Sequence, residues 1–368
     1  MLKNKVIKSV LSAALSIVLM AGAAGCGNTS GTSDSSSAAV SSQSASASGS
    51  TASGTSAGAS AQSSTAAAPS ADKDLVIRYG YQPGHSQVVI ADKKGFFNEE
   101  FAKDNITFKF SKFQSGPALV TSFTAGELDF GQVGDLPALS AKANNVDAKI
   151  IGKYISSDKV NGLLVAKNSG IKTIADLKGK KVGVTIGSTG HQLLYIYLES
   201  VNLKPSDIQQ VNLQPGDIVS SLVSGNIDAA VTWEPYVTMT IAKGVTDQIA
   251  DGVGYKKEVD VIIGNNSFLQ QHPDASARIL KVLDKAGKWI AQNKEEALKL
   301  VGEDAGIDPS ILAPTFSKVV VDDIGLSDED ITSIKQSQEF LRKYEILKKD
   351  VDVDSLVDTQ YLKLAGIQ

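Results

Sequence analysis

The sequence predicts an α/β fold made of two similar lobes that are joined by a two-strand hinge. The first observation is a repeated order of strand, turn and helix, met once near the start of the folded region and again in the middle of the chain. The second is that both copies end in similar short sequence motifs. The third is a pair of apolar segments, predicted as strands, that flank the second copy. Strands that alternate with helices imply mainly parallel sheets.

The two copies follow the same local plan, with an apolar run before a turn that opens a helix. The predicted strand, turn and helix are residues 75–79, 82–85 and 86–94 in the first copy, and residues 182–186, 187–191 and 192–200 in the second. In parallel sheets the ligand site lies at the carboxyl ends of the strands, where both turns fall. The turns are therefore candidate ligand sites.

Each copy then returns through a helix that ends in glycine, followed by a strand. The closing phrases run from Gly126 to Phe130 and from Gly225 to Ala229, and each contains an aspartate. Six residues beyond that aspartate lies a second acid beside a proline turn, which is Asp135 in one copy and Glu234 in the other. The shared spacing predicts equivalent positions in the two lobes.

Two apolar strands at 162–166 and 259–263 flank the second copy, so the chain is expected to cross between the lobes twice. Helices are predicted near 275–293, 295–302 and 328–344, the last with Ser327 as N-cap, and they complete the first lobe. The predicted organisation is a signal peptide over 1–25, a tether over 26–73, a first lobe over 74–166 that resumes over 259–368, and a second lobe over 167–258.

The first residues predict export and attachment to a membrane. Three lysines precede an apolar stretch from Val10 to Met20, and Ala23-Ala24-Gly25-Cys26 resembles the bacterial lipobox. Lipidation of Cys26 would anchor the chain at the extracytoplasmic face of the cell membrane, while plain secretory cleavage is the alternative. The Ser, Ala, Thr and Gly tract that follows has no aromatic residue or apolar period, which predicts a flexible tether.

Composition excludes several classes of partner and site. The formal net charge is −4. Cleavage of the signal peptide would also remove three lysines and make the mature chain more negative, so no nucleic-acid partner is expected. With one cysteine the chain forms no internal disulfide, and we expect a monomer stabilised by burial alone. The histidines lack metal-ligand spacing, so neither a metal nor a cofactor is expected. No nucleophile elbow is present, and no catalytic residue is assigned.

The turn at 187–191 places backbone amides, Ser188 and Thr189 at the start of a helix, where an anion is attracted. An ordinary capped helix start is the alternative reading. His191 either donates a hydrogen bond to the ligand or is hydrogen-bonded within the protein at the start of the helix. Only three arginines occur in the chain, which disfavours an arginine clamp and favours a compact oxyanion such as a sulfonate held by amides and hydroxyls.

Three further side chains are candidates near the cleft. Trp233 is read as an apolar wall for an aliphatic ligand tail, with a core or hinge contact as the alternative. Asp135 and Glu234 would repel an anion, so they either point at lysines and backbone amides or accept an ammonium group of a zwitterion. The sequence leaves both possibilities open.

The folded region resembles the extracytoplasmic solute-binding proteins of the aliphatic sulfonate, taurine and nitrate import family, and most of all its alkanesulfonate branch. The resemblance spans residues 74–368 and rests on the order of short phrases at 80–82, 116–117, 131–137, 176–180, 187–191 and 233–236. It implies a periplasmic-binding-protein type II fold that delivers its solute to the subunits of an ABC permease and performs no chemistry. The residues that the resemblance places at the cleft are Gln82, Ser115, Gly116, Gly134, Asp135, Ser188, Thr189, His191, Trp233 and Glu234.

Two departures from the family pattern concern specificity, namely Glu234 in place of an expected aspartate and Pro83 in the first turn. An aliphatic sulfonate is the expected solute, with taurine, nitrate or a pyrimidine precursor of thiamine as alternatives in the same role. The alternatives of a different class are an enzyme on the same fold and a surface adhesin. Relatives of the enzyme type use iron and a cysteine-rich segment, whereas the single cysteine here lies in the leader.

Overall fold

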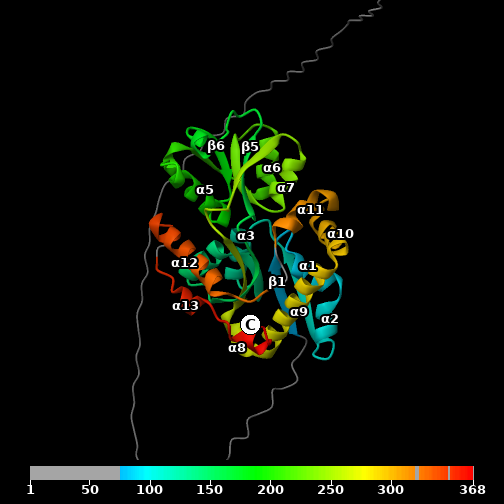
Figure 1. The fold of residues 1–368 in the computed structure, drawn as a ribbon. Helices are drawn as coiled ribbons and strands as arrows, with labels where there is room; N and C mark the ends of the chain where they lie inside the picture. The colour runs from blue at the N-terminus through cyan, green and yellow to red at the C-terminus, as the bar shows by residue number, and fades with distance from the viewer. Residues whose placement is uncertain (1–74, 320–322, 347–348, 368) are drawn as a thin grey trace, which may run out of the picture. The chain divides into compact units, whose positions relative to one another are not determined.

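The structure, a computed structural model, describes residues 75–319, 323–346 and 349–367 (Figure 1). The predicted signal peptide, the lipidation site at Cys26 and the tether lie outside these residues. The described chain forms two five-stranded sheets with helices packed around them, so the predicted two-lobed α/β fold is confirmed. Within the described ranges, no helix combines the length and the apolar character needed to cross a membrane.

The first lobe begins with four strands and four helices. They are β1 Leu75–Tyr81, α1 Ser86–Lys93, α2 Phe96–Phe101, β2 Ile106–Lys112, α3 Gly116–Thr124, β3 Phe130–Gly134, α4 Asp135–Ala143 and β4 Ala148–Ser157. The buried strand β3 carries no exposed side chain, because helices cover both of its faces.

The second lobe repeats the alternation of strands and helices. Its elements are β5 Asn161–Ala166, the 3₁₀ turn Ile174–Leu177, β6 Lys181–Val184, α5 Thr189–Ser200, the 3₁₀ turn Pro205–Asp207, β7 Gln209–Asn212, α6 Pro215–Val223, β8 Ala229–Trp233, α7 Tyr236–Ala242 and β9 Thr246–Asp251. Helix α5 begins at Thr189 rather than at the predicted residue 192, because the Ser188 hydroxyl caps it by accepting a hydrogen bond from the His191 N–H.

The chain returns to the first lobe through β10 and ends in helices. These elements are β10 Glu258–Asn265, α8 Asn266–Gln271, α9 Pro273–Gln292, α10 Lys294–Ala305, α11 Pro309–Lys318, α12 Asp328–Lys343, α13 Val353–Leu356 and α14 Gln360–Leu364. Helices α9, α10 and α12 were predicted, as was the Ser327 cap, which forms a capping box with Asp330. Helix α11 was not predicted, because prolines stand at its start and inside it.

The strand order shows that the two lobes share one topology. The first sheet has the order β2-β1-β3-β10-β4 and the second has the order β7-β6-β8-β5-β9. Each strand of the first sheet thus has a counterpart at the same place in the second. The repeated plan read from the sequence is therefore confirmed.

The sheets are mixed rather than mainly parallel, which differs from the prediction. Strands β1, β2 and β3 are parallel, but β10 lies antiparallel between β3 and β4. In the second sheet β5 lies antiparallel between β8 and β9. The predicted lobe boundary at residue 166 therefore differs from the strand pairing, because β5 belongs to the second sheet.

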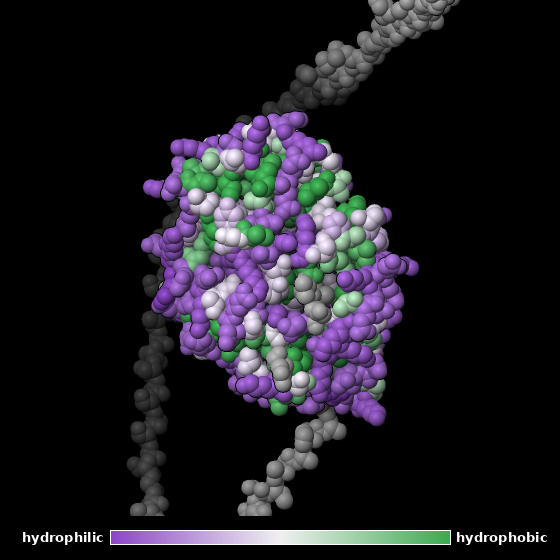
Figure 2. Space-filling model, in the orientation of Figure 1, coloured by the Kyte–Doolittle hydropathy of each residue, from purple (hydrophilic) through white to green (hydrophobic). Residues whose placement is uncertain are grey.

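Helices α11 and α12 contact the second lobe as well as the first. Helix α11 packs against α7, and the Ser337 hydroxyl on α12 lies 3.1 Å from the Gln192 side-chain oxygen on α5. Figure 1 shows α11 and α12 at opposite sides of the molecule as drawn, each close to the level at which the two lobes meet. Most of the face seen in Figure 2 is hydrophilic, including the area over α9 and α2.

The repeated aspartates hold equivalent strands in place. Asp129 accepts hydrogen bonds from the backbone N–H of Arg78 at 2.8 Å and from its guanidinium group at 2.6 and 3.0 Å. Asp228 accepts one from the backbone N–H of Lys181 at 2.8 Å. Asp129 is buried, whereas Asp228 is half-buried.

We expect Asp129→Ala to lower the free energy of unfolding by roughly 2 to 4 kcal/mol, because it leaves the partly buried backbone N–H and the guanidinium group of Arg78 without their partner. Asp228→Ala, the matched variant in the second lobe, should cost only about 1 kcal/mol. Urea denaturation of both variants measures the difference. Equal losses would contradict the larger role given to the pair of Asp129 and Arg78.

Candidate functional site

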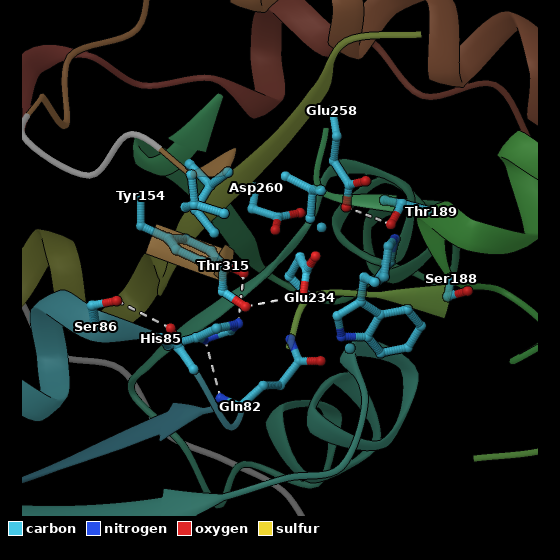
Figure 3. Close-up of a pocket in the computed structure, with 18 of the residues that line it drawn as sticks. Gln82, His85, Ser86, Tyr154, Ser188, Thr189, Glu234, Glu258, Asp260 and Thr315 are labelled. Carbon is cyan, nitrogen blue, oxygen red and sulfur yellow. Dashed lines mark hydrogen bonds between the residues drawn. The ribbon is translucent and has the colours of Figure 1, made fainter. Parts of the chain in front are cut away.

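A cavity lies between the two lobes and is lined by residues from both (Figure 3). Its volume is about 660 Å³, a value that includes its mouth. The lining comes from the two predicted turns, from β4, β8 and β10, and from helix α11 with Val319 directly after it.

Seven of the ten residues predicted at the cleft line this cavity: Gln82, Gly116, Gly134, Ser188, Thr189, Trp233 and Glu234. The other three, Ser115, Asp135 and His191, are buried and are not part of its wall. Their role at the ligand stays a prediction.

Four helices of the described chain begin at the cavity. Its wall includes the first residue of α1, Ser86, the first of α3, Gly116, and the first of α5, Thr189, together with Gly134, the N-cap of α4. The first N–H groups of a helix lack partners within it, and the positive end of its dipole lies there. The described wall contains no lysine or arginine. Attraction for an anion therefore comes from the helix starts.

The two hydroxyls predicted to hold a ligand are already engaged. Ser188 donates to the Thr185 carbonyl at 2.7 Å, and Figure 3 shows its hydroxyl directed away from the other labelled residues. Thr189 donates to Glu258 at 2.5 Å, which joins the second lobe to the first. Both hydroxyls were expected to donate to a ligand, but in the structure each donates to a protein group instead. Ser188 also acts as a helix cap.

Asp135 and Glu234, the two acids whose partners could not be predicted from the sequence, both pair with lysines. Asp135, which is 0% exposed, pairs with Lys256 at 3.1 Å and accepts a hydrogen bond from Ser337 at 2.6 Å. Glu234 pairs with Lys318 of α11 and accepts hydrogen bonds from the hydroxyls of Thr238 and Thr315, each at 3.0 Å. The lysine alternative is therefore the one that the structure contains.

Ser115 and His191, the two other predicted residues that are buried behind the wall, make hydrogen bonds at or next to the start of a helix. Ser115 caps α3 and accepts from the backbone N–H of Ala118. The His191 ring accepts from the Gly187 N–H at 3.4 Å and packs edge-on against Tyr195, with ring centroids 4.5 Å apart. Burial lowers the pKa of His191 to about 4, so the ring is neutral near pH 7.

The sequence reading missed two acids on β10 that line the cavity. Glu258 and Asp260 are buried, and Figure 3 shows both carboxyl groups beside the same space. Burial raises the pKa of Asp260 to about 6, and burial together with repulsion by Asp260 raises the pKa of Glu258 well above its usual value. The available signal was two acids two residues apart within an otherwise apolar strand, which places both on one face.

His85 and Tyr154 form a second group that the sequence reading did not place. The His85 Nδ1 atom accepts from the Gln82 N–H at 3.1 Å, and its Nε2 atom lies 2.8 Å from the Tyr154 hydroxyl. Burial lowers the pKa of His85 to about 3, so a neutral ring donates from Nε2 to the tyrosine. Tyr154 in turn hydrogen-bonds to Asp260. This chain fixes the first turn against β4 and β10.

Two glycines allow the lobes to approach closely. A Cβ atom on Gly134 would lie 2.6 Å from the Thr189 methyl group, and one on Gly84 would lie 3.0 Å from the Pro235 ring. Gly84 also has a φ of +86°, which side chains rarely adopt. Glycine at both positions is therefore required by contacts made between the lobes.

We expect Asp260→Asn to stabilise the protein near neutral pH by roughly 1 to 3 kcal/mol and to leave its stability near pH 4 unchanged. The folded chain holds the Asp260 proton up to about pH 6, whereas the unfolded chain releases it near 3.8. The stability contributed by this proton is full below that lower value and is lost as the pH rises through 6.

Urea denaturation of the variant and the unchanged protein from pH 4 to pH 8 measures this difference. Taking the difference cancels the opposite contribution of the two buried histidines. Asp247→Asn is the control, because that side chain is 61% exposed. A difference between Asp260→Asn and the unchanged protein that stays constant across this pH range would contradict a buried proton at Asp260.

Comparison with known proteins agrees with this geometry. A relative from Bacillus subtilis (strain 168), provisionally named an aliphatic sulfonates-binding protein, is 32% identical over 78% of this chain and 87% of its own length. A relative from Escherichia coli (strain K12) with the same name is 26% identical over 78% of this chain and 89% of its own.

Among solved structures, the alkanesulfonate-binding protein SsuA from Xanthomonas axonopodis pv. citri, bound to MOPS, has a TM-score of 0.72 at 23% identity. The match covers 78% of this chain and 99% of that chain, and it shows that the lobes form the periplasmic-binding-protein fold. The sequence also matches the NMT1/THI5-like family over residues 82–297, which is more than half of its length. With its duplicated sheets and a cavity between them, this chain is a member of the NMT1/THI5-like family.

Proposed function

We propose that this protein is the extracytoplasmic solute-binding component of an ABC importer and that it captures an aliphatic sulfonate between its lobes. The observation that carries the proposal is the gathering of four helix starts around one cavity, in a wall whose described residues include no lysine or arginine. A sulfonate spreads one charge over three acceptor oxygens, which suits several N–H donors. Both curated relatives are named for binding such compounds, and SsuA holds MOPS, a sulfonate.

The rest of the cavity wall offers apolar surface for the organic part of the solute. Trp233 comes from the second lobe, while Ile155 and Phe316 come from the first and Val160 from the crossing between them. Aromatic and aliphatic walls of this kind bury an alkyl chain. Nitrate has no such chain, so the apolar wall favours a sulfonate over nitrate.

Capture requires the two lobes to close on the solute. The crossings between the sheets are residues 158–160 and 252–257, and they lie outside both sheets. A ligand that contacts both lobes binds their closed arrangement better and so shifts the population toward it. The closed, loaded protein is then the form presented to the permease subunits.

The leader supports the proposed location. Cys26 would carry the lipid anchor on the extracytoplasmic face of the membrane, and the tether would let the monomeric lobes reach the permease. Among the enzyme alternatives, hydrolysis by Ser188 is disfavoured because its hydroxyl donates to the Thr185 carbonyl and serves as a helix cap. An adhesin would not need paired helix starts around a cavity. We therefore propose a binding protein without catalytic activity.

We expect sulfonates with two- to four-carbon chains to raise the unfolding midpoint of the purified protein, because ligands that bind the native state stabilise it by mass action. Differential scanning fluorimetry with such sulfonates, nitrate, sulfate and the thiamine pyrimidine measures the effect. A response to nitrate or to the pyrimidine but to no sulfonate would contradict the proposed solute.

We expect Gly134→Ala to weaken sulfonate binding by about tenfold or more, because the added Cβ would lie 2.6 Å from the Thr189 methyl group and hold the lobes apart. Gly216→Ala is the matched control, since a Cβ there meets no atom within 4 Å. Isothermal titration calorimetry measures both affinities, and the unfolding midpoint of each empty variant reports folding. Equal affinities would show that binding does not need this approach of the lobes.

A further inference from the structure

Helix α11 forms part of the cavity wall although it lies outside the duplicated plan of the two lobes. The helices α5, α6 and α7 of the second lobe follow strands equivalent to those before α1, α3 and α4, so α11 has no counterpart among them. The match to the NMT1/THI5-like family ends at residue 297, before α11 begins at Pro309. Apart from α11 and Val319 directly after it, all wall residues lie between 82 and 260. Helix α11 is therefore an addition to the wall that the duplicated lobes provide.

This added helix brings apolar surface to the cavity. Phe316 and Val319 line it, and both pack against a core cluster that also contains Trp233, Val160 and Ile155. Those three residues line the cavity as well. The wall thus has an apolar side to which both lobes and α11 contribute. The organic part of a sulfonate would be stabilised on this side by burial of its apolar surface.

Two polar residues fasten α11 to the second lobe through Glu234. The Thr315 hydroxyl donates to Oε2 of Glu234 at 3.0 Å, as Figure 3 shows, and Lys318 pairs with Oε1. The Glu234 side chain is 1% exposed and directly follows Trp233 in the chain. Loss of either partner would leave a buried carboxylate with fewer donors, which is costly. The contact therefore fixes α11 beside the apolar side of the cavity.

The spacing of residues on α11 joins these two contacts. Phe316 directly follows Thr315, and Val319 directly follows Lys318, so the side chains that line the cavity stand next to those that contact Glu234. On its other side, α11 is held in the core of the first lobe by Leu312, which is 0% exposed. A change in how Glu234 holds the helix would therefore move Phe316 relative to the rest of the wall.

We propose that Phe316 limits the size of the organic group that the cavity accepts, and that Lys318 is a positioning residue that holds α11 in place through Glu234. This inference rests on the proposed function and narrows its solute class to sulfonates with short alkyl chains. The helix starts would bind the sulfonate group of any such solute, whereas Phe316 would select among the chains. A change at Phe316 should therefore alter the selection among sulfonates more than sulfonate binding itself.

Isothermal titration calorimetry of the purified protein with propane-1-sulfonate and octane-1-sulfonate tests the proposal. The unchanged protein should bind the shorter compound more tightly. Phe316→Ala removes a ring and opens space for the added methylenes, so the affinity for octane-1-sulfonate relative to propane-1-sulfonate should rise by at least about tenfold. Phe316→Leu is a milder change to the packing of α11, and it should raise the same ratio by about threefold.

Phe268→Ala is the matched control, because Phe268 is a half-buried phenylalanine that packs against the same core cluster but is not part of the wall. It should leave the ratio unchanged, and the unfolding midpoint of each variant without solute reports folding. An equal change of both affinities in Phe316→Ala would overturn the role of Phe316 and leave the proposed function intact. So would an equal shift of the ratio in Phe268→Ala, or tighter binding of octane-1-sulfonate by the unchanged protein.

Lys318 is not part of the described wall, so an effect of this residue on the ratio would act through α11. Lys318→Met keeps an apolar stem but removes the partner of Glu234, and it should raise the ratio by about threefold or more. Added to Phe316→Ala, it should raise the ratio no further, because both changes act on one contact. Glu296→Gln, which removes the ion pair with Lys94 from the neighbouring helix α10, is the control and should not change the ratio.

A lower unfolding midpoint of Lys318→Met with an unchanged ratio would give Lys318 a structural role only and overturn its positioning role. Binding of neither sulfonate by the unchanged protein, with the thermal panel also silent for sulfonates, would overturn the proposed function and this inference together.

Discussion

The first lobe depends on a strand that the chain supplies only after it has built the second. Strand β10 pairs with β3 on one side and with β4 on the other, so β4 joins its sheet only through β10. Strand β5 fills the same position between β8 and β9. Each lobe is therefore fixed by a strand that is continuous with a crossing, which confines relative movement of the lobes to the few residues between the ladders.

The same strand sets the electrostatics of the cavity. Alternate residues of β10 face opposite sides, so Glu258 and Asp260 line the cavity while Val259 and Val261 pack into the core beneath α4 and α12. A shift of one residue would bury both acids in that core and expose the valines to the cavity. The ladder with β3 and β4 thus specifies which groups a solute meets.

The sequence was sufficient for the repeated fold because its signals are local: apolar runs, glycine-closed helices and turn phrases recur in the same order. It was also sufficient for the turns that line the cavity, since Gly134 and Thr189 stand in such phrases. It left the partners of the acids open, because Lys256 lies 121 residues from Asp135 and Lys318 lies 84 residues from Glu234. Pairings at that separation follow from how the lobes meet, which no local pattern encodes.

The cost of closing the lobes without a solute follows from these contacts. Glu258 belongs to the first lobe and its donor Thr189 to the second, so separation of the lobes exposes the acid to water. When the lobes meet, Glu258 and Asp260 lose that water, and burial raises the pKa of both acids, which favours their protonated forms. This loss of water from two acids opposes the empty closed form, whereas the contacts that a solute makes with both lobes favour closure. The difference between these two states makes closure depend on loading, which a permease needs in order to distinguish a filled receptor from an empty one.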